Sequence, residues 1–430
     1  MKRRIENRNW CAGSCLLGLA LFGNPGYAEE INRPDLPPPV QIESALDNHL
    51  LVLNATSSLK MEHANQRKWN SGNYEFNLRA GTGQRKIVGT GQNLKEWNVA
   101  LERPLRLFNK VGIDKDIGAA SVARAGYALG DARHEAARAL LQLWFAWQRE
   151  QAQAALWQQQ VNILKQQAQM AEKRVRAGDA PRLELNQAQA AAAQAGVSWH
   201  QARLRAQLAG NDLTNQFPAI QLPEKLPPAT PQAVEHDFSF WKSRVLEHNH
   251  ELGMAQEQSR VQQLLAQRSR ADQLPDPTVG VGYANEQGGN EKVTGVYLSV
   301  PISFGQRSAT AEGVAQQAAI AADQEAFVKR RLEGDIYAAY TQTVSSFATW
   351  QQAHEAAQAI RSNAELVAKA YSLGESSLSD SFIARRFALE SSLAEILAQL
   401  DANEARYRLL LDAHQLWPLE NEDEHHANHY

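Results

Sequence analysis

Three histidines near the C-terminus are the residues best suited to binding a metal ion. His425, His426 and His429 lie among four acidic residues within residues 420–430. Imidazole is a good ligand for Zn, Cu and Ni, so this segment is a candidate weak metal site. The other interpretation is a disordered polar tail with no ligand, and the strongly polar composition favours it.

No catalytic group of residues is evident elsewhere. The sequence contains neither an HExxH zinc motif nor a GxSxG nucleophile motif. Four further histidines lie in polar segments with a helical pattern: His134, His200, His248 and His250. We expect them to be solvated helix residues, because isolated histidines of this kind are seldom ligands. The protein is therefore predicted not to be an enzyme and to need no cofactor.

The overall composition excludes other classes of function. The 430 residues include 44 Lys and Arg against 47 Asp and Glu, whereas nucleic-acid binding requires a basic surface. The two cysteines, Cys11 and Cys15, are too few for a disulfide framework or a four-thiolate metal site. The abundance of Ala and Gln favours long, closely packed helices.

The first 28 residues have the pattern of a secretory signal peptide. Basic residues at positions 2–4 precede an apolar run at 11–22, and Gly26 and Ala28 are the small residues of a cleavage site. A membrane anchor is the weaker interpretation, because crossing a bilayer takes about 20 apolar residues. No later segment has 18 consecutive apolar residues, so we expect no membrane-spanning helix.

The rest of the chain contains an internal duplication. LERPLRLF at residues 101–108 corresponds to LSVPISFG at residues 298–305. Pro104 precedes Gly178 by 74 residues, and Pro301 precedes Gly374 by 73. We predict a first repeat at 29–217, a Pro-rich linker at 218–231, a second repeat at 232–417 and a tail at 418–430. Each repeat is expected to run helix, two strands, very long helix, glycine turn and shorter helix.

The very long helices follow from a heptad pattern. Between residues 112 and 177 there is no proline, and apolar residues recur every seven positions: Leu140, Trp147, Ala154, Val161, Ala168 and Val175. About 66 residues at 1.5 Å each give a helix roughly 100 Å long. Taken alone, this pattern favours a solvent-exposed coiled coil.

Two pairs of strands argue for a membrane protein instead. Apolar or aromatic residues recur at every second position at 74–78 and 97–101, and again at 279–283 and 296–300. Gly81, Thr82 and Gly83 are expected to form the turn of the first pair, and Gly288, Gly289 and Asn290 that of the second. The runs are about the 9–11 residues that a tilted membrane strand needs. Four strands cannot close a barrel, so oligomerisation is required.

At this point the sequence resembles the TolC-like outer-membrane efflux family. The resemblance covers residues 42–417 and is carried by the two strand-to-helix passages and by the turns GDAPRLEL at 178–185 and GESSLSDS at 374–381. It implies a mostly α fold with a small β part, in which long antiparallel helices of three protomers form an α-barrel. Four strands from each protomer would form a twelve-strand β-barrel in the outer membrane.

The resemblance also implies a function and partners. The homotrimer would be the passive exit duct of a tripartite efflux system, extending from the outer membrane into the periplasm. A periplasmic adaptor (membrane fusion) protein and an inner-membrane pump of the RND type would be its partners, together with outer-membrane lipid. The residues assigned to adaptor docking and to the aperture at the periplasmic tip are Gly178, Glu184, Gly374, Ser377 and Asp380.

Two alternatives stay open at the level of sequence. Glu184 and Asp380 occupy equal positions in the two turns, so they either form charged rings that favour cations or cap the helices that follow.

Residues 101–110 also resemble the heavy-metal (Czc-type) efflux branch, although Arg106 and Asn109 differ from its pattern. Heavy-metal cations are therefore a candidate substrate. A periplasmic coiled-coil adaptor or structural protein is the alternative function.

Overall fold

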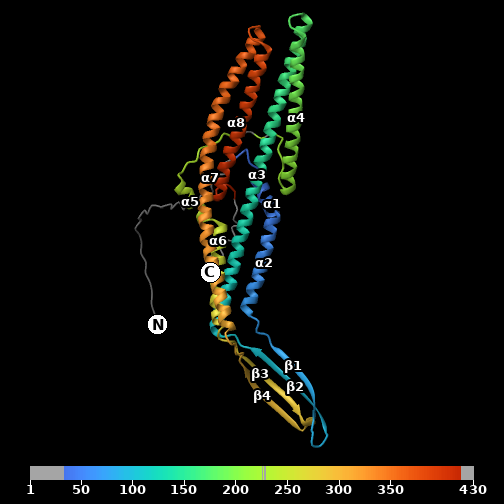
Figure 1. Ribbon diagram of the computed structural model, residues 1–430, viewed down its shortest axis with the longest axis vertical. Coiled ribbons are helices and arrows are strands. Elements are labelled where there is room, and N and C mark those ends of the chain that lie inside the picture. The colour runs from blue at the N-terminus through green and yellow to red at the C-terminus, as the bar shows by residue number, and fades with distance from the viewer. Residues whose placement is uncertain (1–32, 225, 227–228, 418–430) are drawn as a thin grey trace, which may run out of the picture.

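The computed structural model describes residues 33–224, 226 and 229–417. The predicted signal peptide at 1–28 and the His-rich tail at 418–430 lie outside the described residues. The described chain is a long rod of helices, with a four-stranded sheet extending at an angle from one end (Figure 1). The turns of two helical hairpins form the other end.

The chain contains the same series of elements twice. The first series is α1 (Pro39–Asp47), α2 (Leu50–Ser71), β1 (Asn77–Lys86), β2 (Asn93–Pro104), α3 (Phe108–Ala177) and α4 (Arg182–Gln216). The second is α5 (Phe238–Glu247), α6 (His250–Ala271), β3 (Thr278–Glu286), β4 (Glu291–Ser299), α7 (Gln306–Leu373) and α8 (Leu378–Asp412). Helices α2 and α6 have 22 residues each, α3 and α7 have 70 and 68, and α4 and α8 have 35 each. The predicted duplication is confirmed, whereas the repeat boundaries stay predictions.

The heptad pattern identified the packed side of α3. Leu140, Trp147 and Val161 are 0%, 3% and 2% exposed, while Ala168 and Val175 are half-buried. At 1.5 Å per residue, 70 residues make a helix about 105 Å long.

Within the described ranges, no helix combines the length and the hydrophobicity needed to cross a bilayer.

The strands form one antiparallel sheet in the order β1-β2-β3-β4. The sheet therefore joins the two repeats through the β2–β3 pair, in which Leu101 lies opposite Val281. In the second hairpin, a one-turn 3₁₀ segment (Gln287–Gly289) forms the predicted turn, and Gly288 and Gly289 have φ of 69° and 103°.

The predicted turn of the first hairpin is wrong. Gly81, Thr82 and Gly83 lie inside β1, opposite Asn98, Trp97 and Glu96. The chain reverses at residues 87–92, where Gly91 has φ of 69°. Tyr74, in turn, precedes the strand, because β1 begins at Asn77.

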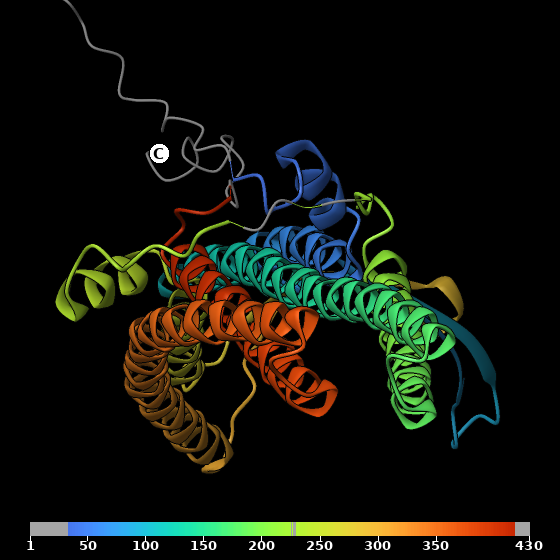
Figure 2. The same ribbon diagram turned by 90° about the horizontal axis from the view of Figure 1, so that it is seen from above.

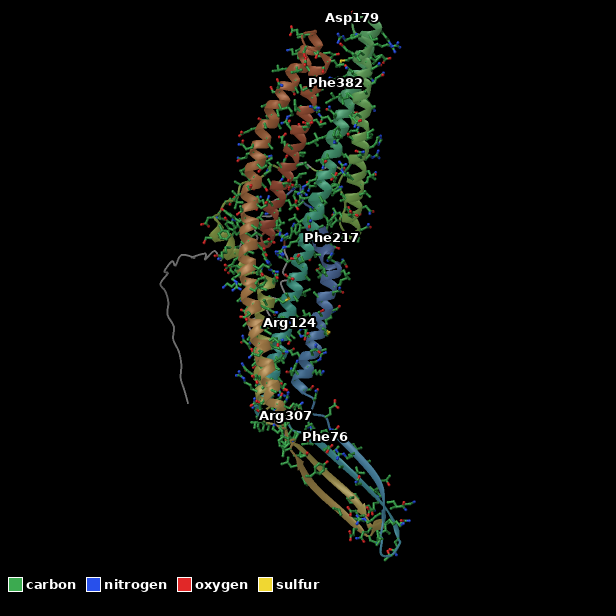
Figure 3. All side chains as sticks on the ribbon, in the orientation of Figure 1. Phe76, Arg124, Asp179, Phe217, Arg307 and Phe382 are labelled. Atoms are coloured by element: carbon green, nitrogen blue, oxygen red, sulfur yellow. The ribbon has the colours of Figure 1, made fainter. Side chains whose placement is uncertain are left out.

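The main hydrophobic core lies midway along the rod, where α3 meets α8 and the segments that lead into each repeat. Trp144, Phe145 and Phe217 are 1%, 0% and 0% exposed, and the label of Phe217 marks this level in Figure 3. The Trp144 indole donates a hydrogen bond of 2.7 Å to the backbone oxygen of Asp35. Seen from above, α1 and α5 lie at the periphery of the long helices (Figure 2).

Candidate functional site

The two hairpin turns at the far end of the rod share one backbone geometry. Gly178 and Gly374 end α3 and α7 with φ of 80° and 83°, a left-handed conformation that glycine adopts without strain. The next amide in each turn, that of Asp179 or Glu375, donates 2.9 Å back to the carbonyl of Arg174 or Ala370. Asp179 marks this end of the molecule in Figure 3. Both glycines therefore lie where the chain must reverse.

Ser377 and Asp380 form a capping box at the start of α8. The Ser377 hydroxyl accepts from the Asp380 amide at 3.1 Å, and the Asp380 carboxylate accepts from the Ser377 amide at 3.2 Å and from its hydroxyl at 2.7 Å. These hydrogen bonds lower the pKa of Asp380 below its usual value. Asp380 therefore caps the helix, which was one of its two expected roles.

Glu184, at the equal position of the first turn, makes different contacts. Its helix begins after Pro181, which has no side chain able to cap. The Glu184 carboxylate lies 3.4 Å from Arg174 Nη1 and 3.4 Å from the Tyr371 hydroxyl. The Arg174 guanidinium donates 3.0 Å to that hydroxyl and lies over the Tyr371 ring, 5.5 Å from its centroid.

This cluster of Arg174, Glu184 and Tyr371 connects the two hairpins near their tips. Arg174 and Glu184 belong to α3 and α4, whereas Tyr371 belongs to α7. Burial raises the pKa of Tyr371, and the neighbouring Glu184 carboxylate adds to the shift. Sequence reasoning missed the roles of Arg174 and Tyr371. The available signal was their position in the last turn of each long helix, directly before Gly178 and Gly374.

At the opposite end, the sheet has one strongly apolar face. Successive side chains of a strand point to opposite faces of the sheet. The pairing register therefore aligns every second residue of each strand on this face. Its large apolar side chains are 36–81% exposed in the single chain: Leu78, Trp97, Val99, Leu101, Val279, Val281, Val296 and Leu298. Exposed apolar patches of this kind mark a surface that contacts another apolar phase or partner.

The other face of the sheet is polar and carries small residues. Glycine or alanine occupies many of its positions: Gly81, Gly83, Ala100, Gly280, Gly282, Ala284 and Gly295. Its charged side chains pair with one another. Arg79 lies 2.9 Å from Glu102, and Arg85 lies 2.7 Å from Glu96 and 2.9 Å from Glu286.

A buried ionic network joins the sheet to the helices. The Lys110 ammonium, with no exposed side-chain surface, lies 2.9 Å from both Asp272 and Asp276 and donates 2.8 Å to the carbonyl of Leu274. Close by, the Asp114 carboxylate pairs with Arg106 at 3.0 Å and with Arg268 at 2.5 Å. The charges come from α3, from the segment before it, from the last turn of α6 and from the segment between α6 and β3. The network therefore fixes where the strands leave the rod.

Burial would raise the pKa of Asp276 within this network. The hydrogen bonds from Lys110, from the Tyr74 hydroxyl at 2.9 Å and from the Leu107 amide at 3.2 Å outweigh that effect. The net result is a pKa of Asp276 below its usual value. The carboxylate is therefore held in its charged form.

The expectation of solvated histidines is wrong for His134. This residue is 6% exposed, its Nε2 lies 3.0 Å from the Leu411 carbonyl, and its ring centroid lies 5.2 Å from that of His414 and 6.4 Å from that of His250. Burial lowers the pKa of His134 to about 2, with the Arg138 charge adding to the effect. Among the described residues, no group of three or more His, Cys, Asp or Glu side chains could hold a metal ion.

Comparisons with known proteins agree with this architecture. Residues 42–216 match the family model described as "Outer membrane efflux protein". No curated protein sequence matches the chain. Among solved structures, the CmeC outer membrane channel of Campylobacter jejuni has a TM-score of 0.73 at 14% identity, covering 90% of this chain and 88% of that one.

Two further structures share the fold. The outer membrane protein VceC of Vibrio cholerae has a TM-score of 0.71 at 15% identity, covering 90% of this chain and 100% of that one. The MtrE outer membrane channel of Neisseria gonorrhoeae has a TM-score of 0.59 at 16% identity, covering 88% of this chain and 90% of that one. The first repeat therefore matches the outer membrane efflux protein family model, and both repeats share the fold of these outer membrane channels.

Proposed function

We propose that the chain is the passive exit duct of a tripartite efflux system, spanning the outer membrane and extending into the periplasm. The two-faced sheet carries this proposal. Its apolar face suits the hydrocarbon core, and its polar face of small residues suits a water-filled lumen. The helical rod would then continue the lumen through the periplasm.

We propose a homotrimer, because the sheet of one chain cannot close on itself. Strands β1 and β4 are the two edges of the four-stranded sheet, and unpaired edges are too costly in lipid. The resemblance to TolC-like outer membrane channels implies a trimer, and three copies of four strands would give a closed twelve-strand barrel.

The tip turns would form the periplasmic aperture and the docking site for a periplasmic adaptor. The residues assigned to this role are Gly178, Glu184, Gly374, Ser377 and Asp380. The resemblance to this family implies an adaptor and an inner-membrane pump as partners, and a pump of the RND type is the proposed one. In a trimer, Glu184 and Asp380 would each occur three times and favour cations.

The acidic rings can be tested by ion selectivity. Glu184→Gln combined with Asp380→Asn is expected to reduce the cation preference measured from reversal potentials under a salt gradient. Replacing Glu375, an acid of the same turn that lies outside the two equal positions, with Gln serves as the control. An unchanged cation preference in the double variant would contradict the acidic rings, and capping would then be the one role of Asp380.

Heavy-metal cations are the proposed substrate class, with His425, His426 and His429 as a weak metal-binding tail. The support is the resemblance of residues 101–110 to the heavy-metal branch and the three imidazoles of the tail. Loss of zinc, copper or nickel tolerance in a deletion strain, restored by the full-length chain, would support this class. Normal metal tolerance would contradict it.

A periplasmic coiled-coil adaptor or structural protein is the second candidate function. The long heptad helices favour it, because they alone would make a soluble rod. That function gives no reason for eight large apolar side chains on one face of a sheet.

Fractionation and conductance decide between these functions. The duct is expected in outer-membrane fractions as a trimer that resists mild heating in detergent, and it should give discrete conductance steps in planar bilayers. A monomer recovered in the soluble periplasmic fraction would overturn the proposal and support the second candidate.

A further inference from the structure

The polar face of the sheet carries one bulky polar group at its helix end. Glycine and alanine occupy the middle of this face, where Ala100, Gly282 and Gly295 lie in one register row with Arg79. The next row toward the helices is different. There Glu102 lies opposite Gly280, and Gly280 lies opposite Tyr297.

The Tyr297 ring lies directly across Gly280. A Cβ atom added to Gly280 would be 2.3 Å from Tyr297 Cζ and 2.8 Å from its Cε1, closer than real contacts allow. Strand side chains usually stand roughly perpendicular to the sheet. This tyrosine instead lies flat against the sheet, because glycine leaves the space that it occupies.

A hydrogen bond holds the ring in that position. The Tyr297 hydroxyl donates 2.8 Å to Glu102 Oε2, so the side chain reaches from β4 over β3 to β2. Arg79 of β1 lies 2.9 Å from Glu102 Oε1. All four strands therefore contribute to one arrangement of Arg79, Glu102, Gly280 and Tyr297.

We propose that Gly280 is a positioning residue that keeps Tyr297 out of the lumen and so sets the bore where the barrel meets the helical tunnel. The inference rests on the proposed function, because this face borders a lumen only in the closed assembly. In a trimer the arrangement would occur three times at one level. A ring released from Gly280 would stand toward the axis and narrow the passage, so the flat position of the Tyr297 ring keeps the passage open.

The test is Gly280→Ala, with Gly282→Ala as the matched control. Gly282 lies on the same strand and face, and a Cβ there would meet Ala100 Cβ at 3.8 Å, an ordinary contact. Single-channel conductance in planar bilayers, and blockage by neutral polymers of graded size, report the bore. We expect lower conductance and a smaller size limit for Gly280→Ala, and wild-type values for Gly282→Ala.

A double variant separates the ring from general strain in the strand. Gly280→Ala with Tyr297→Ala is expected to restore at least the wild-type conductance, because no ring is left to swing out. Equal conductance in Gly280→Ala and Gly282→Ala would overturn the inference. A double variant that stays at the low conductance would overturn it as well.

A third variant keeps the test decisive if Gly280→Ala yields no trimer. Tyr297→Phe cannot bond to Glu102, so its ring is held loosely, and the open channel is expected to show added current noise. An open channel as quiet as the wild type would overturn the inference. Failure of the proposed function is distinguishable, since the wild-type protein would then give no channels.

Discussion

The ammonium of Lys110 lies 2.9 Å from a carboxylate oxygen of Asp276 and has no exposed side-chain surface. Lys110 stands near the start of α3, and Asp276 lies two residues before β3. The pair therefore ties the long helix of the first repeat to the first strand of the second. A buried ion pair is a costly way to make such a connection unless both charges are fully partnered.

Replacing Lys110 with Met should destabilise the protein strongly. The substitution leaves Asp276 and the Leu274 carbonyl without their ammonium partner, and loss of one member of a buried pair costs about 3–5 kcal/mol. Asp276 has 19% of its side-chain surface in contact with solvent, so we expect a cost at the lower end of this range. Thermal unfolding followed by helical circular dichroism measures the effect. Lys115→Met, at an exposed position of α3, is the control, and an equal effect there would contradict this role of Lys110.

His134 should make the free energy of unfolding depend on pH. Its folded pKa of about 2 lies below the unfolded value of about 6.5. The unfolded chain therefore binds a proton below pH 6.5 that the folded chain does not, so stability is lost as pH falls. The free energy of unfolding lost because of His134 should reach about 1.4 kcal/mol at pH 5.5.

The measurement compares His134→Gln with His200→Gln, an exposed position, at pH 7.5 and 5.5. His134→Gln should lose less stability on acidification than the control, because its side chain does not titrate there. Asp131, whose pKa burial raises to about 6, changes stability in the opposite sense and is present in both variants. Identical pH dependence in the two variants would contradict the assignment.

Alanine should have opposite effects at two glycines that border α7 or lie within it. Gly374 has φ of 83° and nothing within 4 Å of an added Cβ, so alanine there meets only backbone strain, worth about 1 kcal/mol. Gly313 lies inside α7 with the same free space, and alanine there should stabilise by about 0.5–1 kcal/mol. Thermal unfolding of both variants tests the difference, and effects of the same sign would argue against a left-handed turn at Gly374.

Tyr371→Phe should widen the tip without unfolding it. The change removes the hydroxyl that bonds to Arg174 at 3.0 Å and to Glu184 at 3.4 Å, while the ring under the guanidinium stays. Two hydrogen bonds between the hairpins are lost, so conductance in planar bilayers should rise at an unchanged melting temperature. Tyr337→Phe, at an exposed tyrosine of α7, is the control. A conductance equal to that of this control would mean that the cluster does not restrict the aperture.

Local chemistry was sufficient to find the two tip turns and the long helices from the sequence. Gly178 and Gly374 were identifiable because a sharp helix end requires positive φ, which glycine adopts most readily. The near-equal distances from Pro104 to Gly178 and from Pro301 to Gly374 predicted paired helices of almost the same length, as α3 and α7 are. Both features depend on residues close together in the chain or on periodicity along it.

Gly81 shows where a local rule failed. A Gly-Thr-Gly sequence normally indicates a turn, yet Gly81 and Gly83 lie two apart on the polar face of β1. Gly81 is small because of the neighbouring strand, since a Cβ there would lie 2.7 Å from Asn98 Oδ1, whereas a Cβ at Gly83 would meet nothing within 4 Å. The identity of the opposite residue depends on register, which the first hairpin sequence did not reveal.

The sequence by itself determined the repeated order of elements, the ends of the long helices and the positions of both tip acids. Only the tertiary structure decided that Glu184 reaches Arg174 and Tyr371, that His134 is buried, and that Tyr297 lies over Gly280. The physical reason is distance along the chain. Propensity and periodicity act over a few turns, whereas these contacts join residues from different helices or strands, and packing alone sets their geometry.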